Sequence, residues 1–384
     1  MKKRTALKFL TILYLLCMMP VNVFAQEDSP PVLELKELVA DDPEFKSTVD
    51  QMFENVKPLS DGSSNPWKNK DIQDLYTFLN EWFYFLPNTH DGLDRILEFS
   101  FLYYGNPNGK KFILEEPGLS WSLNFVEARG KYMDSHASTK KITNWLSDPK
   151  LKNDDFVLPA DGFKSFNDFF TRDLKPGARS ITDISDNSVL VSPADGVINM
   201  INNEIRLDDK IPTKGGMTLS LTELLDGSKY SEKFIGGTAM AVFLLPTNYH
   251  HYHAPISGTI VESRQDVGDR LFGMPDILDI INEGNVAYNK DYSVFQDFRH
   301  GYFIFDTKDF GHIAMIPIGL QTIGSVVFEE KFRNVREGSA VEVYKGDKLG
   351  HFAYGGSTVL LLFEKNRLDA INVQLGQQIG SLKN

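Results

Sequence analysis

The hydrophobic pattern of the chain changes near residue 185, and this change constrains the fold more than any other feature. Between about residues 42 and 158 the pattern is mainly helical, with apolar residues recurring at helical spacing. After about residue 185 the sequence has short apolar runs separated by Gly and Pro, which is typical of β-strands. The sequence therefore predicts an α+β fold, in which a helical portion precedes a β-rich domain. The strand-like runs are 238–246, 301–305, 312–319 and 340–344.

The segment 93–104 shows the helical pattern well. Its apolar residues recur three and four positions apart, while Asp94, Arg95 and Glu98 occupy the other face. A helix lying on a membrane surface would carry mainly Lys and Arg on its polar face. Because this face is mixed in charge, we expect an ordinary helix packed against a protein core.

The first 25 residues have the pattern of a secretory signal peptide. Basic residues at positions 2–4 and 8 precede an apolar run, residues 9–19, and the stretch ends in the small residue Ala25. The apolar run is too short to span a bilayer, although an uncleaved membrane anchor is the alternative. We therefore expect export across the inner membrane, to the periplasm or its membrane surface. Cys17, the single cysteine, would be lost, which leaves no disulfide and no thiolate site.

The charge balance restricts the partners of the chain. Asp and Glu number 52 against 40 Lys and Arg, for a net charge of −12. Such an acidic protein is poorly suited to bind nucleic acid, and it gains no electrostatic attraction from anionic lipid.

Two short clusters in the β-rich part carry polar residues suited to chemistry. In "SPADG", Asp195 lies on a predicted turn, where most aspartates simply bond their own backbone. In "NYHHYHAPISG", His250, His251 and His253 follow an apolar strand. They could bind a metal, but no Cys or acidic residue accompanies them. A role in proton transfer is favoured, because the pKa of histidine suits transfer in both directions.

The third cluster is "GHFAYGGSTVLLLFE", residues 350–364, where Gly-Gly-Ser-Thr interrupts a strand-like run. A turn would explain the glycines. Serine becomes a strong nucleophile only when a base removes its proton, commonly a histidine oriented by a carboxylate. Asp195, His253 and Ser357 could supply these parts, but sequence alone leaves a hydrolase-like triad open. The GxSxG elbow of one large hydrolase class is absent.

Four segments together resemble the phosphatidylserine decarboxylase family of pyruvoyl enzymes. The resemblance covers about residues 160–384, and the helical part before it is similar to the extension of fungal aromatic amino-acid (tryptophan) decarboxylases. The occurrence of all four segments in one chain is specific evidence for the family, whereas each segment alone is weak evidence. The segments are "FNDFFTRDLKPGARSI" (166–181), "SPADGVI" (192–198), "YHHYHAPISGTI" (249–260) and "GGSTVLLLF" (355–363).

The resemblance implies a proenzyme that cleaves itself between Gly356 and Ser357. His253, oriented by Asp195, would activate Ser357 to attack Gly356, which has no side chain to hinder attack. The products would be a β chain ending at Gly356 and an α chain, residues 357–384, that begins with a covalent pyruvoyl group and stays attached through an interior strand. The implied regions are a signal peptide (1–25), a helical extension (26–160) and a catalytic domain (161–384).

The resemblance also implies a decarboxylase that binds a substrate amine as a Schiff base. His250 would then be the proton donor, and no metal or diffusible cofactor would be needed. The retained Asp195 favours conversion of phosphatidylserine to phosphatidylethanolamine, with contact to a membrane surface. Gly355 and the extension instead resemble the branch acting on a free aromatic amino acid. A non-catalytic binding module is a third hypothesis, and a homodimer would be ordinary for the family.

Overall fold

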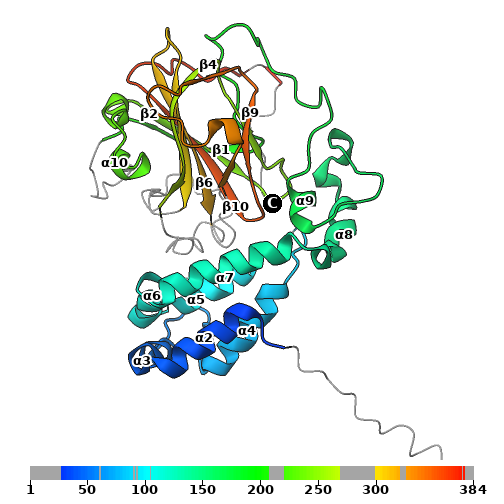
Figure 1. The fold of residues 1–384 in the computed structure, drawn as a ribbon, viewed down its shortest axis with the longest axis vertical. Coiled ribbons are helices and arrows are strands. Elements are labelled where there is room, and N and C mark those ends of the chain that lie inside the picture. The colour runs from blue at the N-terminus through cyan, green and yellow to red at the C-terminus, as the bar shows by residue number, and fades with distance from the viewer. Residues whose placement is uncertain are drawn as a thin grey trace, which may run out of the picture.

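The computed structural model describes residues 27–59, 62–89, 91, 94–103, 105–206, 220–268, 299–320, 326–373 and 375–376. The predicted signal peptide lies outside these residues. Within them, no helix combines the length and the apolar character that crossing a membrane requires. A layer of helices is followed by two β-sheets, so the α+β prediction is confirmed (Figure 1).

The helical part forms its own core, built largely of aromatic side chains. Several helices begin at residues whose side chains accept backbone N–H groups, as Asp42, Asp71 and Asn106 do. Trp82 lies at its centre, with ring contacts to Phe78, Phe99 and Phe125. The helices are α2 (Pro30–Asp41), α3 (Pro43–Gln51), α4 (Ile72–Tyr84), α5 (Asp94–Tyr103), α6 (Pro107–Leu114) and α7 (Gly118–Met133).

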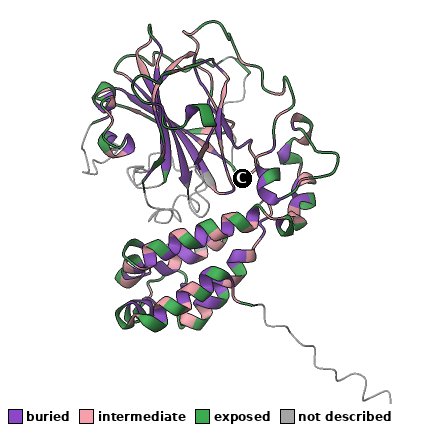
Figure 2. Cartoon of the chain, viewed as in Figure 1, coloured by how far each residue is buried: buried purple, intermediate pink, exposed green. Residues whose placement is uncertain are grey.

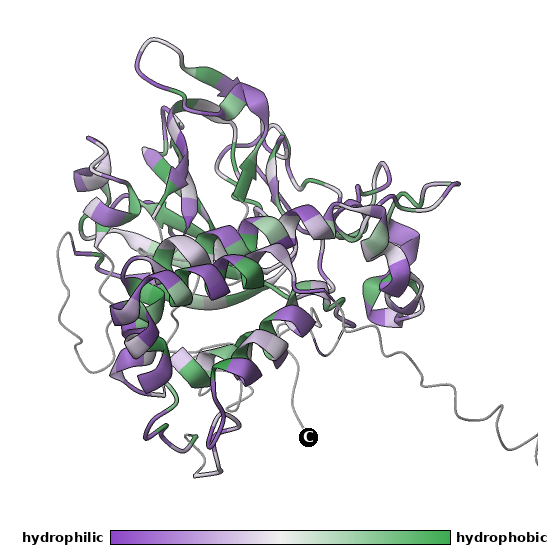
Figure 3. Ribbon diagram, turned by 60° about the horizontal axis from the view of Figure 1, so that its bottom comes forward, coloured by the Kyte–Doolittle hydropathy of each residue, from purple (hydrophilic) through white to green (hydrophobic). Residues whose placement is uncertain are grey.

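Helix α5 matches the amphipathic segment predicted from the sequence. Its residues Ile96, Phe99 and Leu102 are buried in the helical core, so the prediction of a packed helix is confirmed. Figure 3 shows hydrophobic and hydrophilic residues alternating along such helices, as burial on one side requires. Short elements then lead to the sheets: η1 (His136–Lys141), α8 (Ile142–Leu146), η2 (Pro149–Leu151), η3 (Asn153–Asp155) and α9 (Phe166–Phe170).

The β-rich part consists of a seven-stranded and a three-stranded antiparallel sheet. The order of the larger sheet is β1-β2-β10-β6-β5-β4-β8, and that of the smaller is β3-β9-β7. Short helices α10 (Leu221–Leu224), η4 (Ser231–Phe234) and η6 (Glu330–Phe332) accompany them. The strands are β1 (Val197–Asn203), β2 (Thr238–Leu244), β3 (His251–His253), β4 (Gly258–Val267), β5 (His300–Asp306), β6 (His312–Leu320), β7 (Val326–Phe328), β8 (Val341–Val343), β9 (Lys348–Phe352) and β10 (Gly356–Phe363).

Strand β10 is apolar throughout its second half because both faces of the larger sheet are covered. Val359 and Leu361 point into the core shared with the smaller sheet, whereas Leu360 and Leu362 point into the core beneath α10 and η4. Both sets are buried, as the purple strands of Figure 2 show. The prediction of an interior strand is confirmed, and its alternation directs Ser357 to the side of the smaller sheet.

A fourth apolar group joins the helical part to the sheets, and we call it the junction cluster. Its members come from α7, α8, η2 and α9, from the segment that follows α4, and from the segment just before β10. The boundary predicted between residues 160 and 161 precedes α9 and stays a prediction. The buried members are Leu86, Met133, Ile142, Trp145, Leu151, Phe166, Phe169, Phe170 and Tyr354.

Candidate active site

Ser357 is the second residue of β10, at the centre of the larger sheet. It pairs with Leu244 of β2 on one side and with Gly319 of β6 on the other. Residues 353–355 connect β9 to β10, so the bond between Gly356 and Ser357 lies where the chain enters the sheet. Ser357 is fully buried, which shields its hydroxyl from bulk water.

The nearest basic group to this hydroxyl is His250, the residue before β3. Its Nδ1 lies 3.1 Å from Ser357 Oγ. Its Nε2 faces the carbonyl of Pro246 at 3.4 Å, and because a carbonyl only accepts, the proton of the neutral ring belongs on Nε2. Nδ1 can therefore accept the hydroxyl hydrogen of Ser357. Phe170 stacks on the imidazole, with ring centroids 3.9 Å apart, and fixes its plane.

The surroundings of His250 disfavour its charged form. Burial, followed by the positive charge of Arg172, lowers the pKa of His250 to about 3. Arg172 is itself buried between Phe156 and Phe169. His250 is consequently neutral at physiological pH and is a weak base for a step that would leave it protonated.

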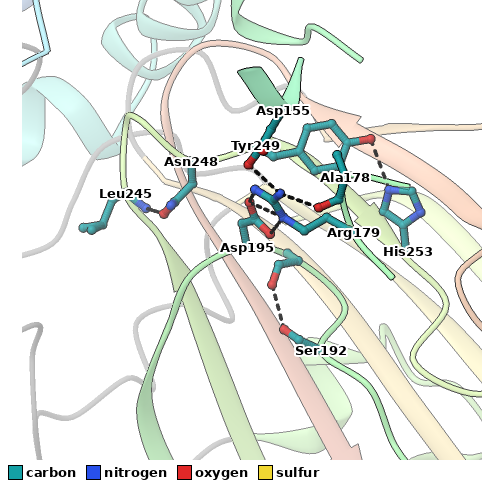
Figure 4. Close-up of polar contacts among 10 residues, drawn as sticks. Asp155, Ala178, Arg179, Ser192, Asp195, Leu245, Asn248, Tyr249 and His253 are labelled. Atoms are coloured by element: carbon teal, nitrogen blue, oxygen red, sulfur yellow. Dashed lines mark hydrogen bonds and ion pairs between the residues drawn. The ribbon is translucent and has the colours of Figure 1, made fainter. Parts of the chain in front are cut away.

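His253 has a different environment at the end of β3 (Figure 4). Its Nδ1 lies 2.8 Å from the carbonyl oxygen of Gly346 and so carries the proton of the neutral ring. Its Nε2 accepts the hydroxyl of Tyr249 at 3.2 Å. Burial and the positive charge of Lys348 lower the pKa of His253, while the hydrogen bond to Gly346 and the negative charges of Asp195 and Asp347 act in the opposite direction.

Asp195 is bound by Arg179 through two nitrogens. Nε of Arg179 lies 3.0 Å from Oδ1 and Nη2 lies 2.7 Å from Oδ2, a fork-like geometry that suits a carboxylate (Figure 4). Nη1 of the same guanidinium binds Asp155 of η3 at 2.7 Å. The hydrogen bond to Asp195 is the largest influence that raises the pKa of Arg179.

The structure thus brings together two of the four predicted side chains, His250 and Ser357. Asp195 and His253 lie close enough for the carboxylate charge to influence the pKa of the imidazole, but their hydrogen bonds go to Arg179, Tyr249 and Gly346. The predicted relay from Asp195 through His253 to Ser357 is not hydrogen-bonded in this arrangement. Its role in cleavage stays a prediction.

Comparison with known proteins decides the family. Residues 166–381 match the family model described as phosphatidylserine decarboxylase. The chain belongs to the phosphatidylserine decarboxylase family. It is 35% identical over 244 residues to a phosphatidylserine decarboxylase proenzyme of Clostridium novyi, covering 64% of this chain and 76% of the relative. A proenzyme of the same name from Fusobacterium nucleatum is 32% identical over 297 residues, which cover 74% of this chain and 91% of the relative.

Three residues of this phosphatidylserine decarboxylase family site did not emerge from the sequence as partners. They are Arg179, which binds Asp195, Tyr249, which binds His253, and Phe170, which stacks on His250. All three lie inside the segments that carried the family resemblance. Those segments identified the neighbourhood, but the pairing depends on contacts between distant parts of the chain.

The three neighbouring histidines separate rather than converge. Nε2 of His251 donates to the carbonyl of Thr171 at 2.7 Å, away from the contacts of His250 and His253. Among the residues that the structure describes, no three His, Cys, Asp or Glu side chains gather in a way that could hold a metal ion.

Proposed function

We propose that the chain is a self-cleaving proenzyme whose mature form is a pyruvoyl-dependent decarboxylase of phosphatidylserine. The observation that carries this proposal is Ser357, which follows Gly355-Gly356 at the start of a buried central strand and contacts an imidazole. The matching relatives are named phosphatidylserine decarboxylase proenzymes, and this name implies a carboxy-lyase made from an inactive precursor. The name of the relatives favours the phospholipid over a free aromatic amino acid as the substrate.

Self-cleavage would use atoms that the chain itself supplies. Ser357 Oγ loses its proton and attacks the carbonyl carbon of Gly356, and the acyl group moves from nitrogen to oxygen to form an ester. Loss of the α-hydrogen of Ser357 then expels the Gly356 carboxylate, and water replaces the nitrogen, which leaves as ammonia. The buried position of Ser357 fits the pyruvoyl group that would remain there, and that group supplies an electron sink for decarboxylation.

The electrostatics favour His253 as the base that takes the proton of Ser357. Protonated His253 would be disfavoured by Lys348 but stabilised by the hydrogen bond to Gly346 and by the charges of Asp195 and Asp347. Protonated His250 would face Arg172 in a fully buried site. To reach Ser357, His253 must exchange its bond with Tyr249. His250 already contacts the side chain from which the pyruvoyl group would form, which supports a place for it beside the reacting atoms in the decarboxylation step. To act as the predicted proton donor there, its Nδ1 would first have to gain a proton.

The pKa of His253 leads to a prediction about self-cleavage and pH. A base must be neutral, and its lowered pKa keeps His253 neutral below the ordinary value of about 6.5. We therefore expect the rate constant for cleavage to fall in acidic solution, with the midpoint of this fall below pH 6.5. Freshly synthesised chains, sampled over time on a denaturing gel, measure this rate. A decline centred at or above pH 6.5 would contradict it.

The substrate and the cleavage can be tested on one preparation. Mass spectrometry of the purified protein is expected to show two chains, one ending at Gly356 and one spanning residues 357–384. Vesicles containing phosphatidylserine should then release carbon dioxide, and L-tryptophan should not. The Ser357→Ala variant serves as the control for both. Release from tryptophan alone would move the proposal to amino acids, and an intact chain would support a non-catalytic module.

We also propose that the protein is exported and acts at a membrane surface. The support is the signal-like sequence of residues 1–25 together with a lipid substrate. The same mass spectrum tests export directly, because removal of the signal peptide would give a β chain that begins at Gln26.

A further inference from the structure

The segment just before the scissile bond is held by α9 and, through α9, by the end of α7 in the helical part of the chain. Tyr354 lies two residues before Gly356, in the connection between β9 and β10, and its side chain is buried in the junction cluster. Its ring packs edge-on against Phe166 and Phe170, with centroids 5.3 and 5.1 Å away. The guanidinium of Arg129, from α7, lies 6.0 Å from the ring centroid. The connection is therefore anchored at this residue.

The backbone of Tyr354 is held as well, through a side-chain amide. Its N–H donates to Oδ1 of Asn167 in α9 at 3.1 Å. Nδ2 of Asn167 donates to Oδ1 of Asp134, at the end of α7, at 2.8 Å. An ionised carboxylate only accepts hydrogen bonds, so Asp134 fixes which end of the amide faces Tyr354. Without it, the amide could turn and present a donor to the Tyr354 N–H.

The same cluster also contacts His250, which lies beside the hydroxyl of Ser357. Phe170, which packs on Tyr354, stacks on His250, and His250 contacts Ser357 Oγ. Nucleophilic attack within a chain requires the reacting atoms to be held close and aligned, and small displacements cost large factors in rate. The junction cluster, which joins α9 to the helical part, thus contacts residues next to both partners of the attack, the carbonyl of Gly356 and the hydroxyl of Ser357.

We propose that the helical N-terminal part positions the bond between Gly356 and Ser357 for self-cleavage, and that Asp134, acting through Asn167 on the backbone of Tyr354, is a positioning residue for this step. The inference rests on the proposed self-cleavage. It assigns the helical part a task before the enzyme is mature. Once the bond is broken, Asp134 no longer influences the chemistry.

The test compares the rate of self-cleavage in freshly synthesised full-length chains. Asp134→Ala is expected to slow cleavage about tenfold, because the amide of Asn167 loses its orientation. Asp134→Asn retains an acceptor and should keep most of the rate. Glu127→Ala is the matched control, since Glu127 is an exposed acid of α7 that pairs with Lys131 at the surface. It should cleave like the parent chain.

Two further measurements separate positioning from a loss of structure. The side chain of Asp134 is exposed, so the midpoint of thermal unfolding of Asp134→Ala should match that of the parent. Decarboxylation per cleaved chain should be unchanged too. Asn167→Ala, at the other end of the link, should slow cleavage in the same way.

The two proposals fail in different ways. If the parent chain cleaves and Asp134→Ala cleaves equally fast, the positioning role is wrong and the proposed function stands. If Asp134→Ala is slow only because its unfolding midpoint has dropped, the positioning role is also wrong. If the parent chain never cleaves, the proposed function is overturned and the positioning role with it.

Discussion

Ser357→Ala is expected to give one uncleaved chain with no decarboxylase activity. In the proposed cleavage the hydroxyl is both the nucleophile that attacks Gly356 and the group whose departure creates the pyruvoyl group, so no other group in the chain would replace it. Alanine fits the buried position without adding volume, and the fold should persist. A denaturing gel and an intact mass measure the first effect, and carbon dioxide release measures the second.

Thr358→Val is the matched control for this variant. Thr358 is the neighbouring hydroxyl residue on β10, it is buried, and its Oγ1 has no hydrogen-bond partner in the described residues. Valine keeps its shape and removes only that hydroxyl, a change that is neutral or stabilising where the group is unsatisfied. We expect normal cleavage. Two fragments from Ser357→Ala would refute the assignment of the cleavage site.

His253→Ala and His250→Ala are expected to fail at different steps. Loss of His253 removes the base whose charged form Asp195 and Asp347 stabilise, and cleavage should slow by about 100-fold or more. His250→Ala should still cleave, because the pKa of about 3 makes His250 a poor base. The cleaved His250→Ala protein should decarboxylate poorly, since it lacks the imidazole beside Ser357.

The reverse result would mean that direct contact with Ser357, and not the surrounding charges, decides which histidine is the base. An uncleaved His250→Ala chain, with normal cleavage of His253→Ala, would show that the proton of Ser357 goes directly to His250 across the observed 3.1 Å. Cleavage in both single variants would point to either imidazole as sufficient, and the double variant would then be uncleaved. Time courses on fresh chains distinguish these cases.

The fold class could be predicted because each region of the sequence has a consistent period. The apolar run 312–319 differs from β6, His312–Leu320, by one residue at its end. The run 340–344 became the shorter β8, Val341–Val343, since pairing with three residues of β4 sets its length. Local pattern thus located the strands, whereas their partners set their ends.

The site could be located but not assembled from the sequence. A strand running through both His250 and His253 would place them on opposite faces, but the strand begins only at His251. The backbone carbonyl of His250 binds Phe352 of β9, which fixes the position of His250 relative to Ser357. Likewise, Arg179 reaches Asp195 and Asp155 across irregular segments whose course no local pattern encodes.

The position of β10 inside the larger sheet has a consequence for how this protein can refold. It is paired with β2 on one side and with β6 on the other, so under the proposed cleavage the strand is in place in the sheet when the bond at its start breaks. After scission, restoring the enzyme from denaturant becomes an encounter between two molecules, so recovery should depend on concentration, as the refolding of the intact precursor does not. The protein thus folds as one continuous chain and works as two, and the cleaved form cannot be converted back into the continuous chain.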